Sequence, residues 1–141
     1  MTLVNKIRAI LGSIDDINTV MYDSGWSANV RIDRNPAPYA LLYLLSDWTL
    51  DISKGVAKEG ADIQVFFFEK ANLDAKGEEK DLIVTRMELI AREFIRRVLA
   101  DNTILVAEDT IKLRSSWGQF DKFCVGVSVT MKLEDKQGGC I

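Results

Sequence analysis

The sequence has 141 residues, of which 48% are hydrophobic and 28% charged, proportions typical of a globular protein and not of a disordered one. A domain of this length buries roughly 70% of the surface that its unfolded chain exposes, so it can form a core unaided. The formal net charge of −3 argues against a general nucleic-acid-binding protein, which needs a basic surface to displace counterions. We expect one domain over residues 1–141, with a flexible polar tail at 135–141.

Signals for export or membrane insertion are weak. Residues 1–14 carry charges among their apolar residues and lack the uninterrupted apolar core of a signal peptide. The longest strongly apolar run, residues 39–45, is far too short to span a bilayer. Cys124 and Cys140 form neither a disulfide framework nor a zinc-binding pattern. We expect a soluble protein of a reducing compartment, with Cys124 buried, Cys140 a free thiol, and no membrane partner.

Residues 2–14 are predicted to form an amphipathic helix with Thr2 as its N-cap. Its apolar residues recur at helical spacing: Leu3, Ile7, Ile10, Leu11 and Ile14. This apolar stripe packs either on the domain's own sheet or on a neighbouring subunit. Residues 17–22 follow as a short strand or an extended arm.

The next segment, residues 23–38, is polar and opens with a turn signal at 23–25. Its two prolines, Pro36 and Pro38, disfavour both a helix and a central strand. Trp26 lies within it and either folds back onto the core or contacts a partner, since tryptophan is enriched among residues that dominate interfaces.

Two strands are predicted at residues 39–52 and 62–69, separated by a glycine-containing loop at 53–61. Residues 39–45 are apolar at every position, which is expected of a central strand covered by helices on both faces. Beyond residue 46 the pattern alternates, as in a half-buried strand. Three consecutive phenylalanines at 66–68 again imply that both faces are covered.

Residues 78–101 have the strongest helical pattern, with acidic residues at the start and arginines near the end, as the helix dipole favours. Glu88 with Arg92 and Glu93 with Arg97 are expected to pair across one turn. Arg92, Arg96 and Arg97 could form a local basic patch, but a solvated helix face is the favoured interpretation.

The last third of the chain is predicted to hold strands. Strand segments at 104–106 and 110–113 are separated by a break near Glu108-Asp109, and residues 115–119 are predicted to form a turn. Residues 120–134 alternate so that one face is apolar and the other is small and polar, a face that another chain could cover. The element order predicts an α+β fold, with an antiparallel or mixed sheet packed by an N-terminal helix and one long central helix.

The sequence contains no motif that carries known chemistry. It has no histidine, which removes the commonest general base and most transition-metal sites, and it lacks phosphate-binding and nucleophile-elbow motifs. We predict no catalytic, cofactor-binding or metal-binding residues. Asp47 and Asp51 would share a face of an unbroken strand, and an enzyme built on them would need raised pKa values. Ordinary solvent-facing strand residues are the favoured interpretation.

Four aromatic residues are candidate partner contacts, because large aromatic side chains are enriched at protein interfaces: Trp26, Trp48, Trp117 and Tyr39.

The chain combines five features in sequence order. They are an N-terminal amphipathic helix, a tryptophan-bearing polar segment ending in Pro36-Ala37-Pro38-Tyr39, central strands, a long helix from Glu78, and closing strands in which Phe120-Asp121 leads into Val125-Gly126-Val127. This combination has a counterpart in a known family of proteins. Over about residues 1–134 the chain resembles the small tail-terminator and tail-completion (neck) proteins of long-tailed phages and prophages. The resemblance implies a non-enzymatic subunit of a homo-oligomeric ring that binds other tail or connector proteins. Its location would be the cytoplasm of a bacterial host or the virion, and it would not read nucleic-acid sequence directly.

Two alternatives remain. The chain could be a small bacterial ligand- or protein-binding module, with an apolar pocket lined by Tyr39, Tyr43 and Trp48. The third hypothesis is the enzyme built on the carboxylates of Asp47 and Asp51.

Overall fold

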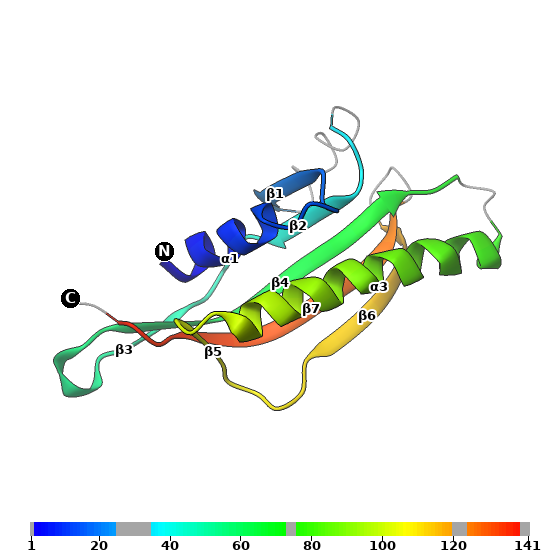
Figure 1. The fold of residues 1–141 in the computed structure, drawn as a ribbon. Helices are drawn as coiled ribbons and strands as arrows, with labels where there is room; N and C mark the ends of the chain where they lie inside the picture. The colour runs from blue at the N-terminus through cyan, green and yellow to red at the C-terminus, as the bar shows by residue number, and fades with distance from the viewer. Residues whose placement is uncertain (1, 25–34, 73–75, 120–123, 139–141) are drawn as a thin grey trace.

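A computed structural model of the chain describes residues 2–24, 35–72, 76–119 and 124–138 (Figure 1). The elements in chain order are α1 (Thr2–Gly12), β1 (Thr19–Asp23), β2 (Tyr39–Tyr43), β3 (Thr49–Asp51), the 3-10 turn η1 (Ser53–Gly55), β4 (Lys58–Lys70), α3 (Gly77–Ala100), β5 (Ile104–Val106), β6 (Lys112–Gln119) and β7 (Cys124–Asp135). This is the predicted α+β fold, with an N-terminal helix and a longer central one. Of the two described α-helices, neither combines the length and the apolar composition that a membrane crossing requires.

The described strands form one mixed sheet in the order β1-β2-β4-β7-β5. β1 and β2 are parallel, and every other pair is antiparallel. The longest ladder joins β4 to β7, from Gly60 opposite Glu134 to Lys70 opposite Cys124. Shorter strands line the outer edges of this pair: β2 and β3 both pair with β4, whereas β5 and β6 both pair with β7.

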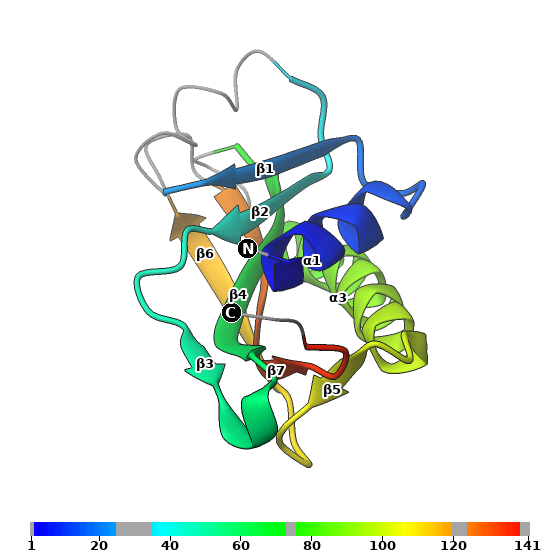
Figure 2. The ribbon, with the colours of Figure 1, turned by 90° about the vertical axis from the view of Figure 1, so that its left-hand side faces the viewer.

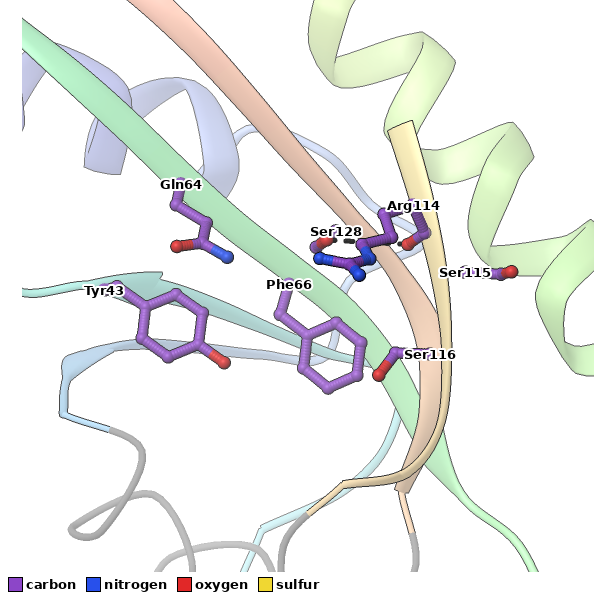
Figure 3. A pocket seen from close by; sticks show the side chains of 7 residues that line it. All are labelled: Tyr43, Gln64, Phe66, Arg114, Ser115, Ser116 and Ser128. Carbon is purple, nitrogen blue, oxygen red and sulfur yellow. Dashed lines mark hydrogen bonds between the residues drawn. The ribbon is translucent and has the colours of Figure 1, made fainter. Parts of the chain in front are cut away.

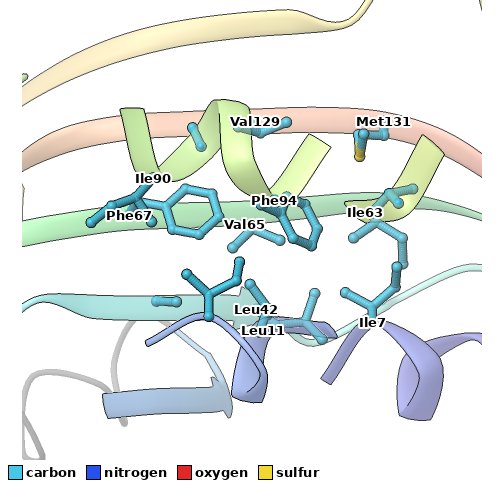
Figure 4. Close-up of a cluster of buried hydrophobic side chains, with 14 of the residues drawn as sticks. Ile7, Leu11, Leu42, Ile63, Val65, Phe67, Ile90, Phe94, Val129 and Met131 are labelled. Atoms are coloured by element: carbon cyan, nitrogen blue, oxygen red, sulfur yellow. The ribbon is translucent and has the colours of Figure 1, made fainter. Parts of the chain in front are cut away.

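Both helices lie on one face of the sheet, where they bury the main core (Figure 2). Figure 4 shows how the two helices and three central strands contribute to it, with labelled side chains Ile7, Leu11, Leu42, Ile63, Val65, Phe67, Ile90, Phe94, Val129 and Met131. The predicted apolar faces of both helices and of residues 125–133 in β7 are confirmed, since alternate residues of this strand are buried.

The opposite face of the sheet carries a second, smaller apolar cluster: Met21, Tyr39, Leu41, Phe66, Phe68 and Cys124. The ring of Phe68 stacks on Phe66 and on Tyr39, with centroid separations of 4.6 and 5.1 Å. Both faces of β2 and β4 are therefore buried, as predicted. The expectation of helices on both faces is wrong for the described residues, because α1 and α3 lie on the same side.

Helix α1 is held by side chains from distant elements. The backbone N–H groups of Thr2 and Leu3 donate to the carboxylate of Glu59 in β4, at 3.3 and 3.0 Å. Thr2, the predicted N-cap, is instead the first helical residue, and a distant carboxylate satisfies the orphan donors. Beyond the other end of the helix, Arg97 Nη1 of α3 donates to the carbonyl oxygen and to the hydroxyl of Ser13, both at 2.8 Å.

Four predicted boundaries are wrong. Residues 39–52 form two separate strands, β2 and β3, instead of one. β4 begins at Lys58, inside the predicted loop 53–61, and β6 continues through residues 115–119, which were expected to turn. In both cases pairing with the neighbouring strand of a hairpin, β3 with β4 and β6 with β7, outweighs the local preference of glycine and serine for loops. Asp135 is not part of a flexible tail, since it is the buried last residue of β7 and binds Lys6 Nζ at 3.0 Å. The predicted break near residues 108–109 is confirmed between β5 and β6.

Candidate functional site

One end of the sheet carries a projecting segment, residues 44–57, which we call the β3 arm. Its strand β3 pairs with the first residues of β4, Thr49 opposite Gly60 and Asp51 opposite Lys58, and η1 closes the turn. Figure 1 shows this hairpin extending past the ends of both helices. Its large apolar side chains are between 37% and 61% exposed: Leu44, Trp48, Leu50, Ile52 and Val56.

Local hydrogen bonds fix the tip of the β3 arm. The Oδ1 atom of Asp51 accepts from the backbone N–H and the hydroxyl of Ser53, at 2.9 and 2.6 Å, a turn geometry that aspartate favours. Leu50 lies in β3 itself, whereas Trp48 directly precedes the strand and Ile52 directly follows it. The arm therefore presents an ordered apolar surface that few side chains of its own chain cover.

The structure does not bring Asp47 and Asp51 together as a catalytic pair. Both are exposed, and the hollows that Asp47 lines do not include Asp51 among their described residues. The hydrogen bonds from Ser53 lower the pKa of Asp51, whereas the carboxylate-enzyme hypothesis needs a raised one. Asp51 thus has a structural role in the turn.

The four predicted contact residues differ in where the structure places them. Trp48 lies half-exposed on the β3 arm, where a partner can reach it. Tyr39 is 2% exposed, and its hydroxyl donates to the Asn35 carbonyl at 2.7 Å, so it belongs to the core and not to a contact surface. Trp26 lies outside the described residues. Trp117 lies in β6, but its side chain is outside the described part.

The apolar pocket predicted from Tyr39, Tyr43 and Trp48 is not formed. Tyr43 and Trp48 line separate hollows, and Tyr39 lines neither of them because its ring packs on Phe68. The spacing of these residues in the sequence therefore does not predict that they lie in three different environments.

A larger hollow of about 460 Å³ lies on the sheet face opposite the helices. Its lining comes from four strands: Tyr43, Gln64, Phe66, Arg114, Ser115, Ser116 and Ser128 (Figure 3). The register explains the grouping, because Phe66 of β4 lies opposite Ser128 of β7, which in turn lies opposite Arg114 of β6. We call this the sheet-face hollow.

Polar groups converge on the sheet-face hollow. Figure 3 shows the guanidinium of Arg114, the amide of Gln64 and the hydroxyl of Tyr43 directed toward the space beside the Phe66 ring, while Ser115 points away. Burial, and secondarily the neighbouring Cys124, raises the pKa of Tyr43, so its hydroxyl stays protonated at neutral pH. The arrangement places one cation and several neutral donors around this space, while the Phe66 ring is itself buried.

Sequence reasoning missed both surfaces in part. The alternation of Leu50 and Ile52 was interpreted as a half-buried strand, and that pattern does not reveal whether a second layer covers the apolar side. Arg114 stands in a polar stretch without local periodicity, so only the β6–β7 pairing reveals its place.

Comparison with protein-family models found none that matches this sequence, and comparison with curated proteins found no match either.

Proposed function

We propose that the chain is a non-enzymatic structural subunit that assembles with copies of itself, as a tail-terminator or neck-like subunit of a phage or prophage would. The observation that carries this proposal is the β3 arm, which displays five large apolar side chains on an ordered projection. Contiguous exposed apolar surface on a soluble domain usually marks an interaction site. The element order that resembles tail proteins supports the assignment to a tail, in a bacterial host's cytoplasm or in the virion, with other tail or connector proteins as further partners.

The energetics of the arm favour a repeated contact over a single one. Complete burial of a side chain of this kind stabilises by about 1.5–3 kcal/mol, and these are already about half buried, so each has roughly 1 kcal/mol left to gain. Association itself costs at least about 4 kcal/mol in lost translational and rotational freedom. A single arm contact is therefore weak, whereas a closed ring repeats the contact and gains avidity.

The arm is also suited to a self-contact because it is not strongly charged. Its sequence contains three charged residues, Asp47, Asp51 and Lys54, and the carboxylate of Asp51 is already engaged by Ser53 within the turn. By contrast, three exposed arginines in the second half of α3 pair with glutamates of the same helix: Arg92 with Glu88 at 3.7 Å, and Arg96 and Arg97 with Glu93. The predicted pairs are confirmed, and the helix surface they form is a solvated charged one.

The test is molar mass by light scattering over a wide concentration range. The double variant Leu50→Ser/Ile52→Ser removes the two most exposed of the arm's five apolar side chains without touching the core. Leu82→Ser/Leu89→Ser on α3 is the matched control, with similarly exposed leucines. We expect the unmodified chain and the control to form a discrete oligomer, and the arm variant to need at least a tenfold higher concentration. A monomeric unmodified chain at all concentrations, or equal behaviour of the three proteins, would contradict the proposal.

A further inference from the structure

We propose that the β3 arm of one copy pairs with the open edge of strand β6 in the next copy, so that the sheet continues from subunit to subunit. This inference rests on the self-assembly proposed above, and it names the surface to which the arm binds. The contact involves residues 49–51 of the arm and residues 112–115 of β6.

Both strands have an edge without a strand partner among the described residues. There, β3 pairs with β4 alone and β6 pairs with β7 alone. The outward N–H and C=O groups along such an edge can form hydrogen bonds with a strand of another chain. Both strands are also accessible, since residues 49–51 and 112–115 are all exposed. Each of the two edges can therefore accept a further strand.

The two open edges face in opposite directions. Gly60 of β4 pairs with β3 on one side and with β7 on the other. Thr130 of β7 likewise pairs with β4 on one side and with β6 on the other. β3 and β6 are therefore outer strands on opposite sides of the central β4–β7 pair. One copy can thus present its arm to one neighbour and its β6 edge to another, which is the head-to-tail contact that builds a ring.

The pairing has a register in which the apolar residues of the two strands meet. Leu50 of β3 lies opposite Glu59, whose carboxylate binds α1, so Leu50 is on the sheet face that the helices cover. Leu113 of β6 lies opposite Val129, a residue of the main core on the same face. The two leucines are 53% and 38% exposed, and pairing them directly opposite each other buries part of both side chains.

The same register brings opposite charges together on the other face of the sheet. β3 is antiparallel to β4, whereas β6 runs in the direction of β4, so copies that keep one orientation pair β3 with β6 antiparallel. Asp51 then lies opposite Lys112 and diagonal to Arg114. Lys58 of the same chain already faces Asp51 from β4, and the contact adds two cations on the open side of the carboxylate.

The cations of β6 have no acidic partner within the described residues. Lys112 and Arg114 lie opposite an uncharged threonine and serine of β7, and none of the ion pairs between described residues includes them. Two β6 edges would repel each other, because antiparallel pairing around Leu113 places Lys112 opposite Arg114. The edge therefore disfavours a second β6 strand and favours β3, in which the one charged residue is Asp51.

The experiment measures molar mass by light scattering over a wide concentration range for the unmodified chain and for a β6 variant, Lys112→Glu/Arg114→Glu. The matched control is Arg92→Glu/Lys136→Glu, which makes the same change in net charge at two exposed positions outside β6. We expect the β6 variant to need at least a tenfold higher concentration to form the oligomer, and the control to stay within twofold of the unmodified chain. Circular dichroism verifies that all three proteins are folded.

An NMR titration then locates the contact. The ¹⁵N-labelled arm variant Leu50→Ser/Ile52→Ser keeps β6 intact, and the unlabelled β6 variant keeps the arm intact. We expect saturable shifts of the backbone amides of residues 112–115 when the β6 variant is added, and none when unlabelled arm variant is added. If the β6 variant does not fold, Lys112→Gln/Arg114→Gln takes its place in both measurements, with an expected loss of at least threefold.

The outcomes separate this inference from the proposal on which it rests. An unmodified chain that never forms an oligomer would overturn both. The β6 contact alone is overturned if the oligomer weakens in the arm variant but not in the β6 variant, if the charge control weakens it equally, or if the amide shifts lie only outside β6.

Discussion

Replacing Gly126 with alanine places a methyl group against the backbone of β4. A Cβ atom built at this position lies 1.9 Å from the carbonyl oxygen of Phe67 and 2.7 Å from the Cα of Phe68, whereas ordinary contacts start at 3.4 Å. The obstructing atoms belong to a central strand and not to a flexible side chain. Because protein interiors are close-packed, β4 and β7 must separate locally by roughly 1 Å or more.

The magnitude follows from two contributions. Overpacking that displaces backbone costs about 1–3 kcal/mol. Separation of the strands also weakens the end of the ladder, from Phe68 opposite Gly126 to Lys70 opposite Cys124, and each hydrogen bond there contributes about 0.5–1.5 kcal/mol. We expect Gly126→Ala to lower the free energy of unfolding by about 3–5 kcal/mol, a large share of the 5–15 kcal/mol typical of a domain.

Urea denaturation followed by circular dichroism measures this loss. The matched control is Gly12→Ala at the end of α1, where an added Cβ meets nothing within 4 Å. Alanine is the better helix former, so the control should be as stable as the parent or more stable by up to about 1 kcal/mol. If Gly126→Ala stays within about 1 kcal/mol of the parent, β7 does not approach β4 as closely as the structure places it.

Two further predictions concern carboxylates. Hydrogen bonds from the hydroxyl and N–H of Thr103 hold the pKa of Asp101 below its ordinary value of 3.8. The ionised Asp101 therefore stabilises the fold fully above pH 3.8, and this stabilisation is lost as the pH falls through the lower pKa of the folded state. Asp101→Asn should lower stability at pH 7 and flatten the decline at acid pH, and a denaturation series that leaves the decline unchanged would refute this. Lys6→Met leaves the buried carboxylate of Asp135 without its cation and should cost about 2–4 kcal/mol, measured by urea denaturation. The double variant Lys6→Met/Asp135→Leu should recover most of that loss, and failure to recover would mean that the pair itself is strongly stabilising.

Periodic segments could be predicted from the sequence, and features made by strand pairing or by contacts between separate elements could not. The apolar stripe of α3 and the alternation in β7 determine which faces are buried, because each pattern spans many residues with one period. Residues 115–119 have the composition of a turn, yet they pair with β7, and local composition contains no information on that partner. The same limit applies to Glu59 at the start of α1.

The candidate sites can likewise be divided into residues that the local sequence identifies and residues that it does not. Trp48 was identified because large aromatic side chains are enriched at protein interfaces. Tyr39 was predicted to be a contact residue, but it is buried because the ring of Phe68 stacks on it. The local sequence around Tyr39 does not reveal this contact. Arg114 was not identified at all, because the hollow exists only where strands from separate parts of the chain lie side by side.

The contacts that hold α1 have a consequence for the order of folding. Its partners Glu59, Arg97 and Asp135 stand 56, 84 and 129 positions away from the residues they bind. Closing such long loops lowers the entropy of the chain before the contacts can offset that loss. Non-local contacts therefore form late in folding. α1 leaves the ribosome before its partners, and it reaches its final position only when β7 is in place. Until then its apolar stripe remains exposed, which makes the nascent chain prone to aggregation until β7 has emerged.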